Sequence, residues 1–481
     1  MKKEIKTGPI MAALLVAGFV GLFSETALNI ALEALSRLFE VDSTTIQWLA
    51  TGYFLTLGIL VPVTGILMQK FTTRQMFLAS LFLSIGGTVL AALAPVFGVL
   101  LAARVIQAAG LAIILPLTQN VIFTIYPPHK RGAAMGIMGL VILAGPAFGP
   151  TLAGMILDTL SWHWIFWFTL PFLLFSVLLG ARYLPNVNEV QKVLIDVRSV
   201  ALSTIGFGGV VYGVSVGGDH GWTSVAVWGC VLVGLLALLA FSIRQTKLEH
   251  PMLNLKAFRF PMFSLGLIMN MITFLNMLSM LVVLPLYMRT AMLVSAFVTG
   301  LLMLPGSLLN CVLAPVIGRL FDTYGPRAVI TPGTILVVLG YGLYAVYGTE
   351  PALWLLAATH IVMMLGIGMV LASVQTNTLN ALPREYYPDG IAITQTSQQV
   401  AGAIGIAVMV SLFSAKRAGY LSGTAGELPA AAAAGSSFVF TISLVLAIVN
   451  VGLSLWMKRP QPAPSNQSAP RKAAYVEGKQ A

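Results

Sequence analysis

Charged side chains are scarce in this sequence of 481 residues: Asp, Glu, Lys and Arg together make up 9% of it, whereas 58% of the residues are hydrophobic. The mean hydropathy is +0.90. A soluble domain does not bury so much apolar surface, and repeated apolar runs of roughly 18 residues or more are typical of helices that cross a membrane. The composition therefore excludes a soluble globular protein and predicts an all-α membrane protein.

Cysteine is also rare, and the motifs of several enzyme classes are missing. Cys230 and Cys311, the two cysteines, both lie in apolar runs, so we expect buried side chains rather than a disulfide or a metal site. There is no Gly-rich nucleotide-binding loop ending in Lys-Ser or Lys-Thr, and no HExxH or CxxC motif. These absences argue against ATP-driven transport and against a membrane enzyme, and we predict no metal and no cofactor.

Hydropathy in a window of about 20 residues predicts fourteen membrane spans, of which the seventh is the shortest. The predicted spans are Pro9–Ala31, Ile46–Met68, Met76–Ala94, Phe97–Phe123, Gly132–Leu157, Trp164–Leu184, Val200–Val216, Ser224–Ile243, Phe263–Tyr287, Ser295–Leu320, Ala328–Tyr347, Leu353–Leu379, Gly390–Phe413 and Phe438–Met457.

Basic residues divide unequally between the loops on the two sides of these spans. If the N-terminus lies in the cytoplasm, all but five of the 27 Lys and Arg residues fall on the cytoplasmic side. The exceptions are Arg37, Arg289, Lys416 and Arg417 in outer loops and Arg104 within a span. This bias follows the positive-inside rule and predicts a multi-pass protein of the cell membrane with both termini in the cytoplasm. It also accounts for the net charge of +11 without nucleic acid as a partner.

Two of the cytoplasmic loops repeat one pattern. Residues 65–75, GILMQKFTTRQ, join the second and third spans, and residues 318–327, GRLFDTYGPR, join the tenth and eleventh. Each loop has a glycine, a hydrophobic residue two positions later and an arginine nine positions after the glycine. Matching loops in two halves of a chain are typical of transporters built from repeats.

The second loop resembles the signature Gly-x-Leu-x-Asp-x-x-Gly-x-Arg of the major facilitator superfamily, and in particular of its fourteen-helix branch of drug:proton antiporters. It matches at Gly318, Leu320, Asp322, Gly325 and Arg327. The resemblance implies that Asp322 takes part in the conformational cycle.

The first loop matches the signature only in part. Gly65 and Arg74 are present, but Gln69 stands where the signature has Asp, and Thr72 where it has Gly. In the family this Asp caps a helix and latches the closed cytoplasmic gate. We therefore expect the latch to be weakened here, with Lys70 and Arg74 left to contact other groups.

Two further stretches support the resemblance. Residues 104–116, RVIQAAGLAIILP, resemble the motif of the fourth helix in Arg104, Gln107 and Gly110. Residues 139–154, GLVILAGPAFGPTLAG, resemble the exporter motif of the fifth helix. Glycine permits close helix contact and proline permits a bend, although an ordinary Gly-rich packing face is the alternative interpretation. The matching positions of the fifth-helix motif are Gly145, Pro146, Gly149, Pro150 and Gly154.

The resemblance covers nearly the whole chain and implies two six-helix bundles with two extra helices between them. We expect an N-terminal bundle in residues 1–184, a linker with the two extra membrane helices in residues 185–262, and a C-terminal bundle in residues 263–457. Residues 458–481 are rich in Pro, Ser, Ala and Lys, which predicts a disordered cytoplasmic tail.

Glu25 is an acid well inside a predicted span, where a charged side chain costs about 2.5–3.5 kcal/mol and indicates a functional site. Glu25 and Arg104 each lie about seven residues from the outer ends of their spans, so both are expected about 10 Å beneath the outer surface. Glu25 either forms a simple ion pair with Arg104 or carries the coupling proton. The family resemblance favours the proton carrier. His360, at a similar depth in the twelfth span, is the rival titratable group, although a structural histidine is the commoner case.

Several neutral polar residues lie inside the predicted spans and are candidates for contact with substrate. These are Thr26, Asn29, Gln107, Asn270, Asn276, Asn310 and Gln399. Methionines are frequent in the ninth span, and flexible thioethers suit a cavity that accepts different apolar ligands.

These observations favour a secondary transporter that exports lipophilic or cationic small molecules from the cytoplasm in exchange for protons. A transporter of a lipid or a small metabolite with the same fold is the first alternative. A membrane receptor without transport activity is the second. The expected partners are the lipid bilayer, protons and the small-molecule substrate.

Overall fold

The structure is a computed structural model that describes residues 7–41, 43–187, 196–220, 224–248, 251–349, 351–423 and 428–459. These residues form fourteen α-helices and three short 3-10 helices, and no strand occurs among them. Thirteen of the α-helices contain a stretch long and apolar enough to cross a membrane, and the remaining one, α5, has 29 residues. The predicted all-α membrane fold is confirmed.

The helices follow the predicted spans in order. The α-helices are α1 (Thr7–Leu38), α2 (Ser43–Lys70), α3 (Thr73–Ala92), α4 (Phe97–Ile125), α5 (Arg131–Thr159), α6 (Trp164–Tyr183), α7 (Val197–His220), α8 (Val225–Lys247), α9 (Pro261–Thr290), α10 (Ala296–Tyr324), α11 (Pro326–Val346), α12 (Leu353–Asn380), α13 (Tyr387–Gly423) and α14 (Leu428–Trp456). The 3-10 helices are η1 (Pro128–Lys130), η2 (Leu255–Arg259) and η3 (Arg384–Tyr386).

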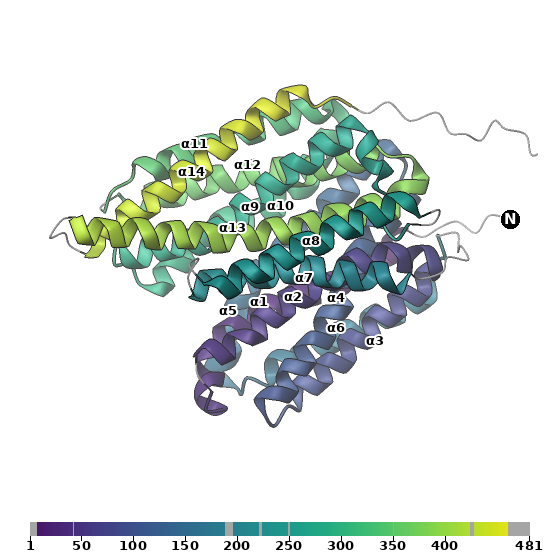
Figure 1. Cartoon of the computed structure of the whole chain (residues 1–481), viewed down its shortest axis with the longest axis horizontal. Helices are drawn as coiled ribbons and strands as arrows, with labels where there is room; N and C mark the ends of the chain where they lie inside the picture. The colour runs from purple at the N-terminus through teal and green to yellow at the C-terminus, as the bar shows by residue number, and fades with distance from the viewer. Residues whose placement is uncertain are drawn as a thin grey trace, which may run out of the picture.

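The helices form two bundles, α1–α6 and α9–α14, joined by the hairpin of α7 and α8 (Figure 1). The hairpin packs through α7 against α2 of the first bundle and α13 of the second. Trp48 of α2 stacks on Tyr212 of α7, with ring centroids 5.8 Å apart. The two extra helices therefore occupy a seam between the bundles.

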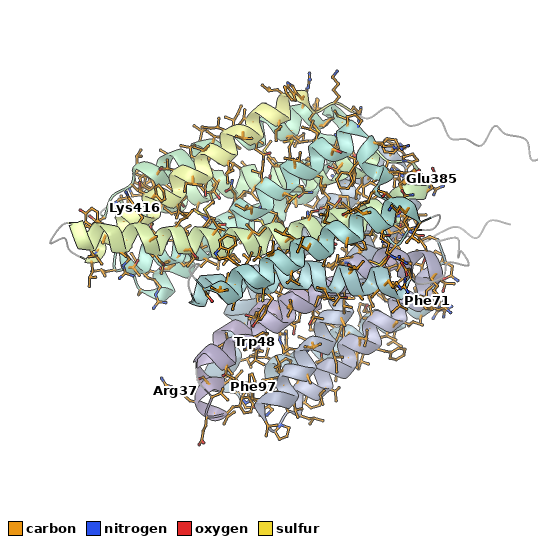
Figure 2. All side chains as sticks on the ribbon, viewed as in Figure 1. Arg37, Trp48, Phe71, Phe97, Glu385 and Lys416 are labelled. Atoms are coloured by element: carbon orange, nitrogen blue, oxygen red, sulfur yellow. The ribbon has the colours of Figure 1, made fainter. Side chains whose placement is uncertain are left out.

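The two ends of the molecule match the predicted division of the loops. Arg37 and Lys416, expected on the outer side, lie at one end, whereas Phe71 and Glu385 lie at the other (Figure 2). The second end holds the loop around Phe71 and, near it, the second repeated loop, which contacts the start of α5 through Asp322. We call it the motif end.

The motif end is where the bundles are joined. A hydrophobic cluster there combines buried side chains of α5, such as Met135, with Leu379 of α12 and Ile391 of α13. At the opposite end, the clusters found in the described residues stay within one bundle. One contains Phe23 and another contains Phe413. The described conformation is therefore closed at the motif end.

The Ala-rich segment 415–435, which connects the last two predicted spans, is mostly helical in its described part. Helix α13 continues to Gly423 and α14 begins at Leu428, while residues 424–427 lie outside the described part. Alanine has the highest intrinsic helix propensity, and α14 has five consecutive alanines in its first two turns. Both helices therefore begin or end beyond the hydrophobic windows that predicted them.

Candidate proton and substrate site

Arg104 is the centre of a polar cluster inside the first bundle. Its side chain has no solvent exposure, and it reaches from α4 to α1 and α2. Nη1 donates to the carbonyl oxygen of Ser24 at 2.9 Å and to the Ser24 hydroxyl at 3.2 Å. Nε donates to the carbonyl oxygen of Leu49 at 3.4 Å. The guanidinium also lies over the Tyr53 ring, 4.1 Å from its centroid. These contacts supply partial negative charge to a buried cation.

Glu25 lies beside Arg104 but is not paired with it through its carboxylate. Arg104 Nη2 donates to the backbone carbonyl of Glu25 at 3.4 Å. In the described part of the chain, no ion pair joins the carboxylate of Glu25 to the guanidinium of Arg104. The ion pair found there connects Arg244 and Asp196. The Glu25 side chain is half-buried. The acid is therefore near enough to respond to the buried positive charge and is not held by it in this conformation.

Gln107 extends the cluster from Arg104 to α3. Its Oε1 accepts from Arg104 Nη1 at 3.2 Å and from the Ser24 hydroxyl at 3.4 Å. Its Nε2 donates to Thr88 Oγ1 at 3.0 Å. Sequence reasoning missed Ser24, Thr88 and Tyr53 because single hydroxyls are common in membrane helices and give no distinctive pattern.

The remaining candidates of α1 behave differently from one another. Thr26 donates its hydroxyl to backbone oxygens of its own helix, at 3.2 Å to Leu22 and 3.3 Å to Phe23. It also packs against Gly149 of α5. The side chain of Asn29 lies outside the described residues.

In the second bundle, Asn270 and Asn276 link helices. Asn270 Oδ1 accepts from Gln398 Nε2 at 2.9 Å, which joins α9 to α13. Asn276 Nδ2 donates to the carbonyl of Ser443 at 3.4 Å, which joins α9 to α14. Both side chains are buried, so their hydrogen bonds are packing contacts in this conformation.

Asn310 and His360 are among the buried polar side chains of the second bundle whose polar atoms lack partners of good hydrogen-bond geometry in the described residues. Neither polar atom of the Asn310 amide and neither ring nitrogen of His360 has a hydrogen-bond partner among the described side chains and backbone. The His360 ring lies close to the backbone of Met303. Gln399 is half-buried on α13. Unsatisfied buried groups are costly, so Asn310 and His360 have capacity left for water or for a ligand.

The glycines of the fifth-helix motif bring α5 against α1. A Cβ on Gly145 would lie 2.6 Å from the Cβ of Leu22, and a Cβ on Gly149 would collide with the Thr26 hydroxyl. Gly154 has open space around it. The side chains of Pro146 and Pro150 lie outside the described residues. Close contact between α1 and α5 is therefore provided by Gly145 and Gly149.

Asp322 in the second loop caps the start of α5. Its carboxylate accepts from the backbone amides of Gly132 and Ala133, each at 2.9 Å. A carboxylate at a helix N-terminus is favoured by the helix dipole. Because α5 belongs to the first bundle and Asp322 to the second, this cap holds the two bundles together at the motif end.

The other residues of the two loops have separate roles. Gly325 has a φ of +87°, a left-handed conformation that favours glycine. Arg327 Nε donates to the carbonyl of Met457 at 2.8 Å, close to the end of α14. Arg74 donates to the carbonyl of Ala181 at the end of α6. Gly65 lies against Ala392 of α13. Both arginines thus contact carbonyl groups near a helix C-terminus, where a cation is favoured.

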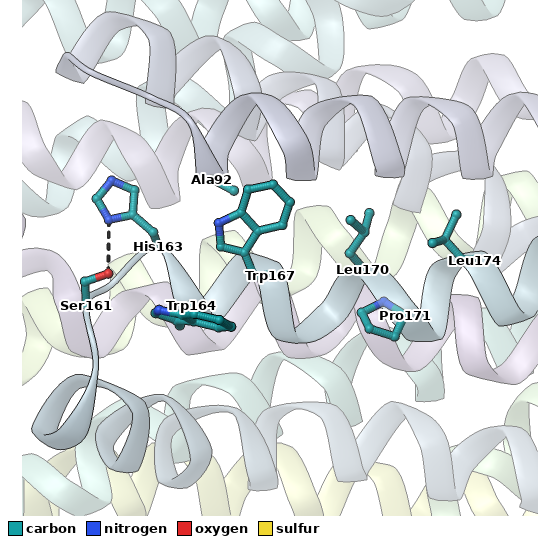
Figure 3. Close-up of a pocket in the computed structure, with 8 residues that line it drawn as sticks. All are labelled: Ala92, Ser161, His163, Trp164, Trp167, Leu170, Pro171 and Leu174. Carbon is teal, nitrogen blue, oxygen red and sulfur yellow. Dashed lines mark hydrogen bonds between the residues drawn. The ribbon is translucent and has the colours of Figure 1, made fainter.

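A separate groove lies along α6, away from this cluster (Figure 3). At one end His163 Nδ1 is 3.3 Å from the Ser161 hydroxyl. Trp164 is half exposed, as expected for an aromatic residue at a membrane interface. The lining residues are Ala92, Ser161, His163, Trp164, Trp167, Leu170, Pro171 and Leu174. None of them belongs to the predicted site.

One motif of serine hydrolases occurs in the chain but in the wrong structural setting. Residues 213–217, GVSVG, match the GxSxG pattern, which sequence reasoning overlooked. They lie inside α7. The catalytic elbow of α/β-hydrolases requires a sharp turn between a strand and a helix, so this match carries no argument for a hydrolase.

Comparison with known proteins identifies the family. The sequence profile of the Major Facilitator Superfamily matches residues 14–406. The lincomycin resistance protein LmrB of Bacillus subtilis (strain 168) is 49% identical over 422 residues, which are 87% of this chain and 88% of that protein. The multidrug export protein EmrB of Haemophilus influenzae is 27% identical over 397 residues, or 82% of this chain and 78% of that protein.

A solved structure shows the same fold at low sequence identity. The crystal structure of the human organic anion transporter MFSD10 (TETRAN) aligns with a TM-score of 0.67 and 14% identity, covering 94% of this chain and 100% of that one. The predicted family and the predicted arrangement of two bundles with two extra helices are confirmed. The chain belongs to the Major Facilitator Superfamily and is a membrane transporter of its drug-efflux branch.

Proposed function

We propose that this transporter exports lipophilic or cationic drugs across the cell membrane in exchange for protons, by alternating access between the two bundles. The observation that carries the proposal is that a half-buried Glu25 lies beside a fully buried Arg104, while its carboxylate forms no hydrogen bond with the guanidinium. A proton-coupled exporter needs a group that binds and releases the proton, and an acid beside a buried cation changes its proton affinity when their separation changes.

The steps follow from this arrangement. The ionised carboxylate of Glu25 is stabilised by the positive charge of Arg104 and attracts a cationic substrate. The protonated carboxyl group is neutral, so it gains no such stabilisation and does not attract a cation. Proton and cation therefore compete for one site. Because α1 carries Glu25 and α4 carries Arg104, a change in the packing of these helices changes the balance between the two occupants.

The substrate class rests on the relatives. Their names specify lincomycin resistance and multidrug export, and we propose lincomycin and a lipophilic cation such as tetraphenylphosphonium as the first probes. We propose that Asn310, Gln399 and Asn29 line the substrate path, together with Gln107 at its proton-coupling end. The unsatisfied amide of Asn310 supports its place in this set.

We propose that the motif end faces the cytoplasm, because the basic loops of the sequence lie on that side. The domain boundaries are proposed at 1–184, 185–262, 263–457 and 458–481. Helix α6 ends at Tyr183 and α9 begins at Pro261, which supports the two inner boundaries within a few residues. The tail from residue 460 lies outside the described residues.

The test is drug-driven proton release in proteoliposomes, compared between the intact protein and Glu25→Gln. The variant keeps the size of the side chain and cannot ionise. Glu40→Gln, which changes an exposed acid, is the matched control. We expect the proton signal to vanish in Glu25→Gln while equilibrium drug binding persists.

Other outcomes contradict the proposal in different ways. A proton signal that survives in Glu25→Gln and vanishes in His360→Gln moves the coupling to His360. Drug binding without any flux would indicate a receptor. Flux of a lipid or metabolite but not of the drugs would indicate the alternative transporter.

A further inference from the structure

Asp389, near the start of α13, joins three separate parts of the chain at the motif end. Its side chain is only 3% exposed. Its Oδ1 accepts from Gln69 Nε2 of α2 at 3.3 Å and from the backbone amide of Asn254 at 3.0 Å. Gln69 belongs to the first bundle, Asn254 to the segment between α8 and α9, and Asp389 to the second bundle. One carboxylate oxygen therefore connects both bundles and the linker.

The two repeated loops contact the opposite bundle with reversed chemistry. The second loop supplies an acid, Asp322, which accepts from the amides of Gly132 and Ala133 at the start of α5. The first loop supplies an amide, Gln69, which donates to an acid at the start of α13. Each junction thus holds one acid between a loop and a helix start. The acid missing from the first loop is replaced by one on the helix that the loop contacts.

The part of the linker between α8 and α9, which contains Asn254, is hydrogen-bonded to the hairpin of α7 and α8. Gln245 Oε1 accepts from the backbone amides of Met252 at 2.6 Å and Leu253 at 3.3 Å. Gln245 Nε2 donates to the Ser199 hydroxyl at 2.7 Å, and that hydroxyl donates to Asp196 Oδ2 at 2.6 Å. Hydrogen bonds therefore run from the base of α7 to the residue that precedes Asn254.

We propose that Asp389 is the acid of a reversed latch, in which Gln69 is the donor and the linker amide of Asn254 is a third component. In this proposal the first loop keeps a latch, although its acid lies on α13 and not in the loop. The proposal rests on alternating access, the motion proposed above. Opening the motif end separates α2 from α13, so the latch must break, and its strength sets the population of the closed state.

The first experiment exchanges the acid and the amide. Spin labels at Arg182→Cys and Arg319→Cys, two exposed positions at the motif ends of α6 and α10, report the separation of the bundles in liposomes. Cys230 and Cys311 are replaced by alanine in this background. Gln69→Glu places two carboxylates together, and we expect the ratio of closed to open protein to fall roughly tenfold. Asp389→Asn keeps the acceptor and loses the charge, so its effect should be smaller.

The double variant Gln69→Glu with Asp389→Asn restores one acid and one amide in the opposite order. We expect it to recover the wild-type distance distribution. Failure of the double variant to close further than Gln69→Glu alone overturns the latch. The single variants and the double variant are all compared as labelled protein in liposomes. A misfolded variant is recognised because its two spin labels show no defined distance in either the closed or the open state.

The role of the linker has its own matched pair. Asn254→Pro removes the backbone donor, and the φ of −80° at this position suits proline. Asn254→Ala keeps the donor and removes only the side chain, which accepts from the backbone amide of Lys256. We expect more open protein in Asn254→Pro than in Asn254→Ala. Equal populations overturn the part of the proposal that concerns the linker.

Proton release in the same liposomes separates this proposal from the proposed function. A normal proton signal without rescue in the double variant contradicts the latch alone. If Gln69→Glu opens the motif end and the double variant closes it again, but the drug drives no proton release, the result supports the latch and contradicts the proposed coupling.

Discussion

Arg104 contacts Glu25 through the main chain: its Nη2 donates to the Glu25 carbonyl oxygen at 3.4 Å, while the carboxylate remains outside the hydrogen bonds of the guanidinium. The guanidinium of Arg104 is thus held by backbone oxygens of α1, and the carboxylate of Glu25 stays available to bind a proton or a cationic substrate. In a structural ion pair, the carboxylate would be bonded to the guanidinium and would not be available for another partner.

Replacement of Arg104 by lysine tests this arrangement. Lysine keeps the charge but cannot reach the Ser24, Gln107 and Leu49 acceptors together from a single nitrogen. Hydrogen bonds to a charged group contribute about 1.5–3 kcal/mol each, so we expect the transport rate per folded protein to fall roughly tenfold or more. Arg289→Lys, at an exposed position, is the control. Unchanged transport in Arg104→Lys would show that only the charge matters.

The glycines of α5 give a matched pair for stability. Gly145→Ala places a methyl group 2.6 Å from Leu22 Cβ and 3.2 Å from the backbone of α1, so α1 and α5 must separate. Overpacking costs about 1–3 kcal/mol, which should lower the melting temperature in detergent. Gly154→Ala enters open space and should change it little. Equal melting temperatures for the two variants would contradict the close contact between α1 and α5.

Asp322→Asn tests the cap between the second loop and α5. Asparagine keeps one acceptor for the amides of Gly132 and Ala133 but removes the charge that interacts with the helix dipole. The loss is about 1–2 kcal/mol. We expect slower drug flux with equilibrium drug binding retained, since the cap is far from the polar cluster. Glu385→Gln, an exposed acid at the same end, serves as the control. Loss of binding together with flux would indicate misfolding instead.

The Asp196–Arg244 pair at the base of the linker hairpin predicts a pH dependence. Arg244 donates to Asp196 at 2.6 Å, and this bond, followed by that of Ser199, lowers the pKa of Asp196 below its ordinary value of 3.8. Because the pKa of Asp196 is lower in the folded than in the unfolded protein, its ionised form stabilises the folded state at pH values above the unfolded-state pKa. This stabilisation is lost as the pH falls toward and through the folded-state pKa. We expect the difference in melting temperature between the wild type and Asp196→Asn to shrink on acidification below about pH 4. A constant difference would contradict an ionic contribution.

The fold was predictable because membrane helices are encoded locally. A span needs only about 20 apolar residues, and the basic loops orient it, so composition and order were enough to predict fourteen helices. The exceptions are at helix ends. Helices α13 and α14 extend beyond their hydrophobic windows into the Ala-rich segment, where helix propensity rather than hydropathy decides the structure.

The depth of the polar groups was also encoded locally, but their partners were not. Counting residues from the span ends placed Glu25 and Arg104 at one level, and the helical rise made that estimate meaningful. The count did not reveal that backbone oxygens of Ser24, Glu25 and Leu49 would surround the guanidinium. Main-chain acceptors leave no trace in the sequence.

The sequence by itself determined the class of this protein, because the free energy of transfer into a bilayer depends on composition over short windows. It showed the two loops and the missing acid of the first. Only the tertiary structure shows that the first loop contacts an acid of α13, Asp389. Gln69 and Asp389 are 320 positions apart, and their contact depends on the packing of α2 against α13, which no local pattern specifies.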